Sequence, residues 1–420
     1  MSDQQSAPEA PAAAPEPAPS RQRRTGFFVL YAGCLAIAGA YGLTLLLPAY
    51  VKSTGGNEAD AGLVYWCGAI GAVGSLVMAG RLAQRIGPSI AAAIGSGCYA
   101  VATLAISLTA YQPVVLGAGV LLGTGWALFF TAAPIVISSW VEPEKRGFYF
   151  LVLAGFNALG MGITPVIGNR LVGSGVEYRT VFGLAAALSV ASVVAFVILV
   201  RGNNRSEERR ENGTATREGS VLGPIREVLT SPAWPFLLMV LLGACVFTAM
   251  NTYQTTFADS RGLDSAYFFI SYTAGVIIPR FTVSKWISNG DPARTSAMLL
   301  AGMCAALIIF LFVGDNVAVY SISSALLGVT YGLVYPLIQA QAANKVSADL
   351  RHWALWYFSL AYFIGVYGFP LIGGWIIVAG SYQVLTVVLL VIAAAELLMA
   401  IWVLSGRVPA KQQAQQTQQQ

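Results

Sequence analysis

One carboxyl group lies deep inside an apolar stretch near the end of the chain. Glu396 follows three alanines and precedes Leu397 and Leu398. A charge in such surroundings is costly and is therefore a functional candidate. A partly buried carboxyl group can bind and release protons, which is the chemistry that proton-coupled transport requires. The alternative is a glutamate that packs against polar groups or extends toward water. We predict Glu396 as a proton-coupling residue.

A second candidate is a basic residue at the end of another apolar stretch. Arg280 directly follows Pro279. One interpretation is a positive charge that binds an anion in a central cavity. The other is a structural arginine that binds helix ends near a membrane face. Spacing alone leaves both open.

Residue types that form catalytic or metal centres are scarce. The five cysteines lie apart in apolar runs without a CxxC pair, and His352 is the only histidine. One histidine cannot build a metal site. The sequence has no GxxxxGKS or GxxxxGKT loop, no GxSxG and no HExxH. We therefore expect neither an enzyme nor a cofactor or metal site.

The composition points to a chain embedded in lipid. Of 420 residues, 56% are hydrophobic and only 10% are charged, whereas soluble domains carry about 25% charged residues. A bilayer core about 30 Å thick needs about 20 apolar residues in a helix. Only helices satisfy the backbone of such runs internally, so an all-α membrane protein is predicted. Twelve spans are expected, at 26–50, 61–82, 88–110, 113–139, 147–171, 180–200, 235–257, 265–287, 293–313, 317–343, 353–378 and 382–405.

Polar segments divide these spans into two groups of six. Residues 1–25 and 406–420 are predicted as disordered cytoplasmic tails. The two six-helix halves are expected at 26–200 and 233–405, with 201–232 as a cytoplasmic linker. The first apolar run is too long for a signal peptide and is predicted to be the first span.

Basic residues are distributed unevenly between the two sides. With the N-terminus inside, only Lys52, Arg170, Arg179 and Arg261 fall outside, and the remaining 20 of 24 fall inside. This bias predicts cytoplasmic termini. Because the charge follows the membrane sides, the net charge of +5 is not taken as a nucleic-acid footprint.

The two halves are copies of one another. A shift of 205 positions places spans 4 and 5 on spans 10 and 11 without a gap, including a Leu-Leu-Gly triplet at 121–123. Pro and Gly let membrane helices bend and approach closely. Six-helix halves around a midplane site are the architecture of alternating access. The matched pairs predicted to take part in gating are Arg146 with Arg351, Pro165 with Pro370, and Gly168 with Gly373.

The loop after the second span and the fifth span carry a family resemblance. Residues 80–87 read GRLAQRIG, similar to the G-x-L-a-D-R-x-G gating motif of the major facilitator superfamily, with Gln84 in place of its acid. The fifth span resembles the motif of the exporter branch of that family, with Thr164 and Asn169 as departures. The chain thus resembles this superfamily over about residues 26–405. The resemblance implies a two-half, twelve-helix fold and gating residues Gly80, Arg81, Arg85 and Gly87, and it favours a gating role for Arg280.

Polar and aromatic residues near mid-depth are the predicted cavity lining. The repeat pairs Trp126 with Tyr331 and Phe130 with Tyr335. An aromatic pocket with few charges suits a neutral or amphiphilic organic solute. Helix packing or an interfacial belt is the alternative for each aromatic ring. The predicted substrate-binding residues are Tyr41, Trp126, Asn157, Asn251, Gln254, Tyr331, Tyr335, Gln339, Trp356 and Tyr362.

Two transport hypotheses follow. The first is proton-coupled export of a small organic compound, such as a drug, a metabolite or a siderophore-like chelator. The second is uptake or exchange of a small carboxylate, with Arg280 as the anion site. A sensor or scaffold is disfavoured because the loops are too short for an effector domain. We expect a functional monomer in a bacterial-type inner membrane.

Overall fold

The fold was analysed in a computed structural model that describes residues 21–142, 145–202, 224–282 and 291–405. Within these ranges, the side chains of 21–24, 79–81, 83, 84 and 348 are not described. The predicted tails and most of the predicted linker lie outside the described residues. Over the described ranges, the chain forms helices and no strand.

The first half contains seven helical segments. They are α1 (Arg21–Thr44), α2 (Leu47–Ser53), α3 (Glu58–Ile86), α4 (Pro88–Leu108), α5 (Gln112–Trp140), α6 (Arg146–Gly173) and α7 (Tyr178–Gly202). The helix α1 begins five residues before the predicted first span. A short break at 45–46 separates it from α2, so the two together cross the bundle as one span.

The second half repeats this plan. Its segments are α9 (Ile225–Thr230), α10 (Trp234–Thr252), α11 (Gln254–Ser260), α12 (Ala266–Thr282), α14 (Pro292–Leu311), α15 (Val317–Asn344), α16 (Ala348–Ala379) and α17 (Tyr382–Leu404). The helix α9 occupies part of the predicted linker. A turn at Tyr253 divides α10 from α11, at a place comparable to the α1–α2 break.

The predicted spans are confirmed as helices. Eleven helices or helix pairs in the described residues are long and apolar enough to cross a bilayer. The predicted eighth span corresponds to α12, which has 17 described residues and packs along α15. The fold class is therefore the predicted one, with twelve membrane helices in two six-helix halves.

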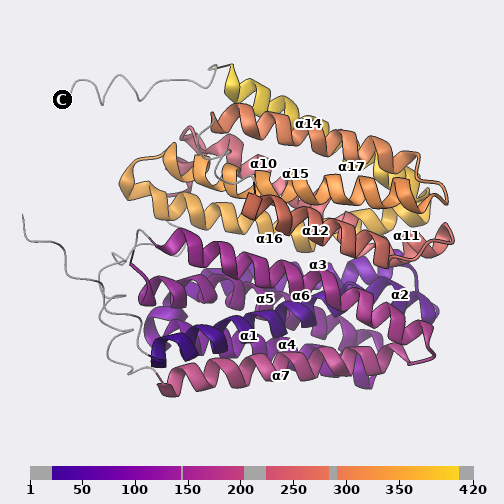
Figure 1. Cartoon of the computed structure of the whole chain (residues 1–420), viewed down its shortest axis with the longest axis horizontal. Helices are drawn as coiled ribbons and strands as arrows, with labels where there is room; N and C mark the ends of the chain where they lie inside the picture. Colours follow the sequence, from indigo (N-terminus) through magenta and orange to yellow (C-terminus); the bar gives the residue numbers. More distant parts are fainter. Residues whose placement is uncertain (1–20, 143–144, 203–223, 283–290, 406–420) are drawn as a thin grey trace, which may run out of the picture.

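The two halves lie side by side with their helices roughly parallel (Figure 1). The main contacts between the halves are α3 with α16 and α6 with α12. We call the end at which α1 begins and α17 ends the terminal face, on the left in Figure 1, and the opposite end the far face. The four basic residues that were predicted to lie outside belong to helix ends at the far face.

Glycines bring helices into direct backbone contact at matching places in both halves. A Cβ atom on Gly123 of α5 would overlap the Gly68 carbonyl of α3. A Cβ on Gly328 of α15, which is 205 positions later, would overlap the Tyr272 carbonyl of α12. Lipid offers no hydrophobic force between helices, so such close packing is a main source of association. The repeat seen in the sequence is thus a repeat of packing contacts.

The two repeat-related arginines also make equivalent hydrogen bonds. Arg146 Nη2 donates to the Ser138 carbonyl oxygen at 2.7 Å, and Arg351 Nε donates to the Ala343 carbonyl oxygen at 3.3 Å. Each acceptor lies eight positions earlier, near the end of α5 or α15. The last carbonyls of a helix lack intrahelical donors, and an arginine there satisfies them and complements the helix dipole. Both arginines therefore stabilise helix ends at the terminal face.

Pro370 has an identifiable partner on another helix. Proline has no N–H, so inside α16 it leaves the carbonyl of Val366 without its intrahelical donor. Thr248 Oγ1 of α10 donates to that oxygen at 2.7 Å. Its repeat mate Pro165 lies inside α6. The proline bend in α16 is thus hydrogen-bonded to α10 of the same half.

The glycine contact between α5 and α3 gives a stability prediction. Gly123→Ala places a methyl group against the Gly68 backbone, whereas Gly117→Ala in the same helix meets no atom within 4 Å. Overpacking costs about 1–3 kcal/mol. We expect Gly123→Ala to lower the thermal unfolding midpoint in detergent, and Gly117→Ala to leave it unchanged or raise it slightly. Equal midpoints for the two variants would contradict the packing described here.

Candidate substrate cavity

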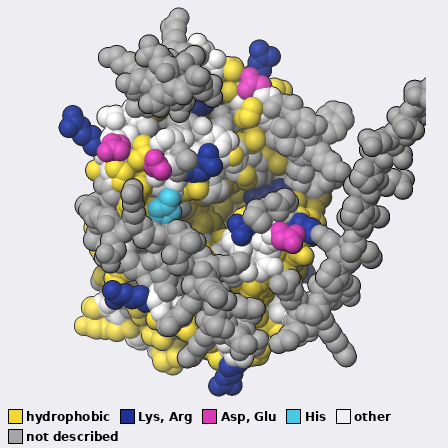
Figure 2. Space-filling model, turned by 90° about the vertical axis from the view of Figure 1, so that its left-hand side faces the viewer, with side chains coloured by type: hydrophobic (Ala, Val, Ile, Leu, Met, Phe, Trp, Pro, Cys, Tyr) yellow, Lys and Arg dark blue, Asp and Glu magenta, His cyan; other side chains and the backbone are white. Residues whose placement is uncertain are grey.

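A cavity of about 680 Å³ lies between the two halves. It is lined by α5 and α6 of the first half and by α10, α12, α15 and α16 of the second. The lining reaches from Trp126 and Tyr331 at mid-depth to Gly147 and Gln339 near the terminal face. Figure 2 shows this face hollowed near its middle, with hydrophobic side chains inside the hollow. The size falls in the range of sites for small organic ligands, about 300–1,000 Å³.

The far face is closed by backbone contacts between the halves. A Cβ on Gly62 of α3 would overlap the Pro370 carbonyl, and a Cβ on Gly374 of α16 would overlap the Glu58 carbonyl. Tyr253 Oη also donates to the Pro370 oxygen. The cavity is therefore accessible from the terminal face alone in this conformation.

Most of the predicted binding residues do line the cavity. The structure brings seven of them together, namely Trp126, Asn157, Asn251, Tyr331, Tyr335, Gln339 and Tyr362. They come from five helices of both halves, as the repeat predicted. Whether they bind substrate stays a prediction.

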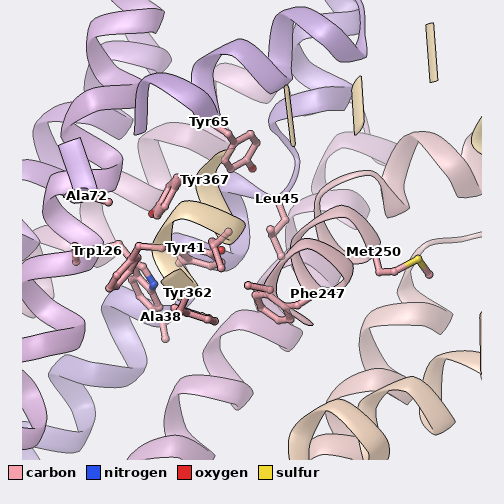
Figure 3. Packing of buried hydrophobic residues seen from close by; sticks show 14 of the residues in the cluster. Ala38, Tyr41, Leu45, Tyr65, Ala72, Trp126, Phe247, Met250, Tyr362 and Tyr367 are labelled. Carbon is pink, nitrogen blue, oxygen red and sulfur yellow. The ribbon is translucent and has the colours of Figure 1, made fainter. Parts of the chain in front are cut away.

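Aromatic rings form much of the inner end of the cavity. Phe130 of the first half stacks on Tyr362 of the second, with ring centroids 6.0 Å apart. Phe247 stacks on Tyr331 at 4.9 Å. Figure 3 shows Trp126 and Tyr362 close together and Phe247 further across. A planar ligand can stack between such surfaces.

Three predicted binding residues lie outside the lining. Tyr41 is buried and packs against Trp126, with ring centroids 4.4 Å apart (Figure 3). Gln254 is buried nearer the far face and accepts a hydrogen bond from Tyr320 Oη at 2.8 Å. Trp356 packs against Trp353 and Tyr357. In this conformation these residues contact protein, because polar and aromatic groups in membrane helices also serve as packing partners.

Arg280 of α12 lies in the cavity wall and binds a backbone oxygen of the neighbouring helix α15. Its Nε and Nη2 atoms donate to the Gly332 carbonyl at 3.2 and 3.1 Å. Pro336 lies four residues further along α15 and cannot donate to that carbonyl. This contact uses two of the five guanidinium hydrogens. Among the described residues that line the cavity none is acidic, so no carboxylate among them lies beside the positive charge of Arg280.

Asn157 contributes an acceptor to the same cavity. Its Oδ1 atom is buried and has no hydrogen-bond partner among the described residues. Asn251 by contrast donates to Phe247 O of its own helix at 2.8 Å. A buried polar atom without a partner is costly. A ligand that donates to Asn157 would remove this cost.

Glu396 is buried and is not one of the cavity-lining residues, although it interacts electrostatically with Tyr331 of the lining. It is 1% exposed in α17, and its carboxylate faces Gly243 of α10. It interacts electrostatically with Cys245 and Cys304. Its Oε2 atom has no hydrogen-bond partner in the described part of the chain. The neighbours named here all belong to the second half.

The remaining predicted gating residues lie near the terminal face or in helix contacts. Gly87 has a φ of 92°, which favours glycine, in the turn between α3 and α4. Arg85 is exposed beside it. Gly80 and Arg81 lie near the end of α3, but their side-chain surroundings are not described, so their gating roles stay predictions. Gly168 packs against Leu43 and Gly373 against Tyr253.

One wall of the cavity was not predicted from the sequence. Phe269, Tyr272, Thr273 and Val276 of α12 line it together with Arg280. Their spacing of three and four residues places them on one face of a helix. That stripe, which ends at Arg280, was the signal available in the sequence.

Comparison with known proteins decides the family. The family model described as Major Facilitator Superfamily matches residues 29–366. The chain belongs to this superfamily. It is therefore a multi-pass membrane protein of a transporter family, as the resemblance implied.

Solved structures of this superfamily's fold match nearly the whole chain. The nucleoside transporter NupG superimposes with a TM-score of 0.73 at 15% identity, covering 91% of this chain and 99% of that one. A peptide transporter POT, solved in complex with sulfate, gives a TM-score of 0.71 at 18% identity, covering 91% and 95%. At these identities the likeness shows the fold alone.

The sequence relatives match a smaller part of this chain than the solved structures do. The cercosporin MFS transporter CTB4 of Cercospora nicotianae is 26% identical over 273 residues, which are 54% of this chain and 53% of that protein. The multidrug resistance protein MdtL of Shigella flexneri is 21% identical over 250 residues, 56% and 62% of the two chains. An uncharacterised MFS-type transporter of Mycobacterium tuberculosis is 24% identical over 66% of this chain and 61% of its own. The matches thus span between half and two thirds of these relatives.

The one-sided cavity predicts a labelling pattern. In a variant without the five native cysteines, Asn157→Cys should react with a water-soluble maleimide added at the terminal face. Thr256→Cys, buried near the far face, should react at least roughly tenfold more slowly, because thiol reactivity follows exposure. The reagent is added separately to right-side-out and to inside-out membrane vesicles, so that it reaches one face at a time. Equal rates at both positions would show that this closed far face is not the resting state.

Proposed function

We propose that this protein is a secondary active transporter that works by alternating access and exports a small organic compound. The observation that carries the proposal is the aromatic cavity between two repeat-related halves, which reaches one face only. Movement of one half against the other would close this end and open the far face. The cavity would then release its contents on the other side.

Similarity to a protein named for multidrug resistance favours export. The matching relatives include a multidrug resistance protein and a cercosporin transporter. The aromatic lining fits amphiphilic compounds of drug size, such as a drug, a metabolite or a siderophore-like chelator. The proposed substrate is therefore held by ring stacking and a few hydrogen bonds.

We assign the terminal face to the cytoplasm of a bacterial-type inner membrane. Basic residues are few at the far face and frequent at the terminal face, which is the bias of cytoplasmic loops. Both termini are then cytoplasmic. The conformation described here would be the one that loads substrate from inside, and one chain would form the complete functional unit.

Proton antiport is the proposed energy source, with Glu396 as the predicted coupling residue. Its buried carboxyl group supports a role in proton binding. Because Glu396 is not itself in the cavity lining, coupling would act through neighbouring groups, of which Tyr331 of α15 does line the cavity. The test therefore has to separate substrate movement from proton movement.

Transport in proteoliposomes with an imposed pH gradient tests export and coupling together. Dyes, drugs, chelators and small carboxylates would be screened. We expect an organic solute to move against the proton gradient, and Glu396→Gln to retain exchange while losing acceleration by the gradient. Glu177→Gln, an exposed acid at the far face, is the matched control. If Glu396→Gln stays fully gradient-driven, the coupling role fails and export stands.

One observation favours a second candidate, the uptake or exchange of an organic anion. The charge of Arg280 has no acidic partner among the described residues of the cavity lining. After the bond to Gly332, three guanidinium hydrogens remain for a ligand. A carboxylate that binds them would neutralise a charge that is otherwise costly in an apolar cavity.

Replacing Arg280 distinguishes the candidates. A charge-assisted hydrogen bond contributes about 1.5–3 kcal/mol, so Arg280→Gln should weaken anion binding by about 10- to 100-fold. Arg294→Gln, exposed and paired with Asp291, should leave it unchanged. If Arg280→Gln abolishes carboxylate transport that runs without a pH gradient, this protein is an anion carrier and not a drug exporter. If neutral solutes move equally in both variants, Arg280 is structural.

A further inference from the structure

A buried carboxylate joins the two halves at the far face. Glu58, the first residue of α3, is 7% exposed. Its Oε1 atom accepts a hydrogen bond from Tyr382 Oη, the first residue of α17, at 2.7 Å. The same oxygen lies 3.3 Å from Lys52 Nζ of α2. One oxygen of the first half thus receives donors from both halves.

The backbone around this carboxylate is also in contact across the halves. Gly374 of α16 packs against the Glu58 carbonyl so closely that a Cβ would overlap it. Tyr253 Oη lies 3.4 Å from that same oxygen and donates to Pro370. The side chain and the backbone of Glu58 are therefore both part of the closure. Opening of the far face must break the Tyr382 hydrogen bond.

Other ionisable groups near Glu58 are few. Lys52 is 56% exposed and can turn toward water. Asp259 of α11 interacts electrostatically with both Lys52 and Tyr382. Asp60, on the same helix as Glu58, accepts from the Asn57 amide at 2.9 Å. Lys52 therefore has a second acidic neighbour when Glu58 loses its charge.

A proton-linked group can drive a movement between two halves only if its surroundings change in that movement. The neighbours of Glu396 belong to its own half and move with it. The neighbours of Glu58 come from both halves. Glu58 is therefore better placed than Glu396 to link proton binding to opening of the far face.

We propose that the Glu58 carboxylate is a proton-sensitive latch that keeps the far face closed while it is ionised and releases it when protonated. The proposal rests on alternating access. The ionised group accepts a charge-assisted hydrogen bond from Tyr382 and attracts Lys52. Protonation removes the charge that attracts Lys52 and that strengthens the Tyr382 hydrogen bond, and Lys52 keeps its electrostatic interaction with Asp259. The closed state is thus stabilised at higher pH and loses this stabilisation as the pH on the far side falls.

The proposed latch is tested by measuring distances across the far face, which requires no substrate. Spin labels at Ser53→Cys and Ser260→Cys, both exposed at the far face and one in each half, report opening. The background has its native cysteines replaced. An ordinary glutamate carboxyl group titrates near about pH 4.3, and a carboxylate that the closed state stabilises is protonated there only at lower pH. Between about pH 7 and about pH 3.5, the open population of the parent should therefore rise on the order of tenfold relative to the closed one.

Substitutions show which group causes the pH-dependent opening of the far face. Glu58→Gln should raise the open population at high pH and abolish its pH dependence, and Tyr382→Phe should raise it while leaving a weaker response through Lys52. Glu58→Asp should restore part of the response, and Glu177→Gln should behave like the parent. The proposal is overturned if Glu58→Gln keeps the full pH response.

Transport measurements separate this result from the proposed function. If distances respond to pH through Glu58 but no solute moves, the latch stands and the proposed substrate class fails. If solutes move with a pH profile that Glu58→Gln leaves unchanged, transport stands and the latch fails.

Discussion

Every backbone carbonyl in the bilayer needs a donor, and the fold described here depends on meeting that need where prolines interrupt helices. Each internal proline removes one N–H and frees the carbonyl four residues earlier. Thr248 binds the carbonyl freed by Pro370, and Arg280 binds the one freed by Pro336. The first bond ties α10 to α16, and the second ties α12 to α15 in the cavity wall. Two bends that shape the second half are thereby hydrogen-bonded to neighbouring helices.

This requirement gives Arg280 two roles that do not exclude one another. A guanidinium group has hydrogens left after satisfying a single carbonyl. The sequence offered gating and anion binding as alternatives, and the geometry shows one group that supports a helix bend while facing an apolar cavity. An anion that binds the remaining hydrogens would also act on the Gly332 bond. Substrate binding and the shape of α15 are then physically linked.

Much of the fold was predictable because lipid imposes simple rules. Length and hydropathy gave the spans, and the 205-residue repeat gave two halves whose contacts match, as Gly123 and Gly328 show. The cavity was predictable in part, since the repeat placed Trp126 and Tyr331 at mid-depth. Periodicity gives the face of a helix but not the layer behind it. Tyr41 therefore proved to be buried against Trp126 and not to line the cavity.

The acids show the limit of sequence reasoning most clearly. The rarity of charge within spans singled out Glu396, whereas Glu58 stands at a helix start next to polar residues and resembles an ordinary loop acid. Its burial depends on Tyr382, which is 324 positions away. No local pattern encodes such a contact.

The closed far face must also be weak enough to open. Its described contacts across the halves are glycine packing and a few hydrogen bonds, and bonds of this kind contribute about 0.6–2 kcal/mol each within membranes. A closure held by such weak contacts can be opened by a ligand or a proton whose binding free energy differs between the two states by a few kcal/mol. Strong packing inside each half and modest contacts between them therefore let the halves move as units, which is the mechanical condition for alternating access.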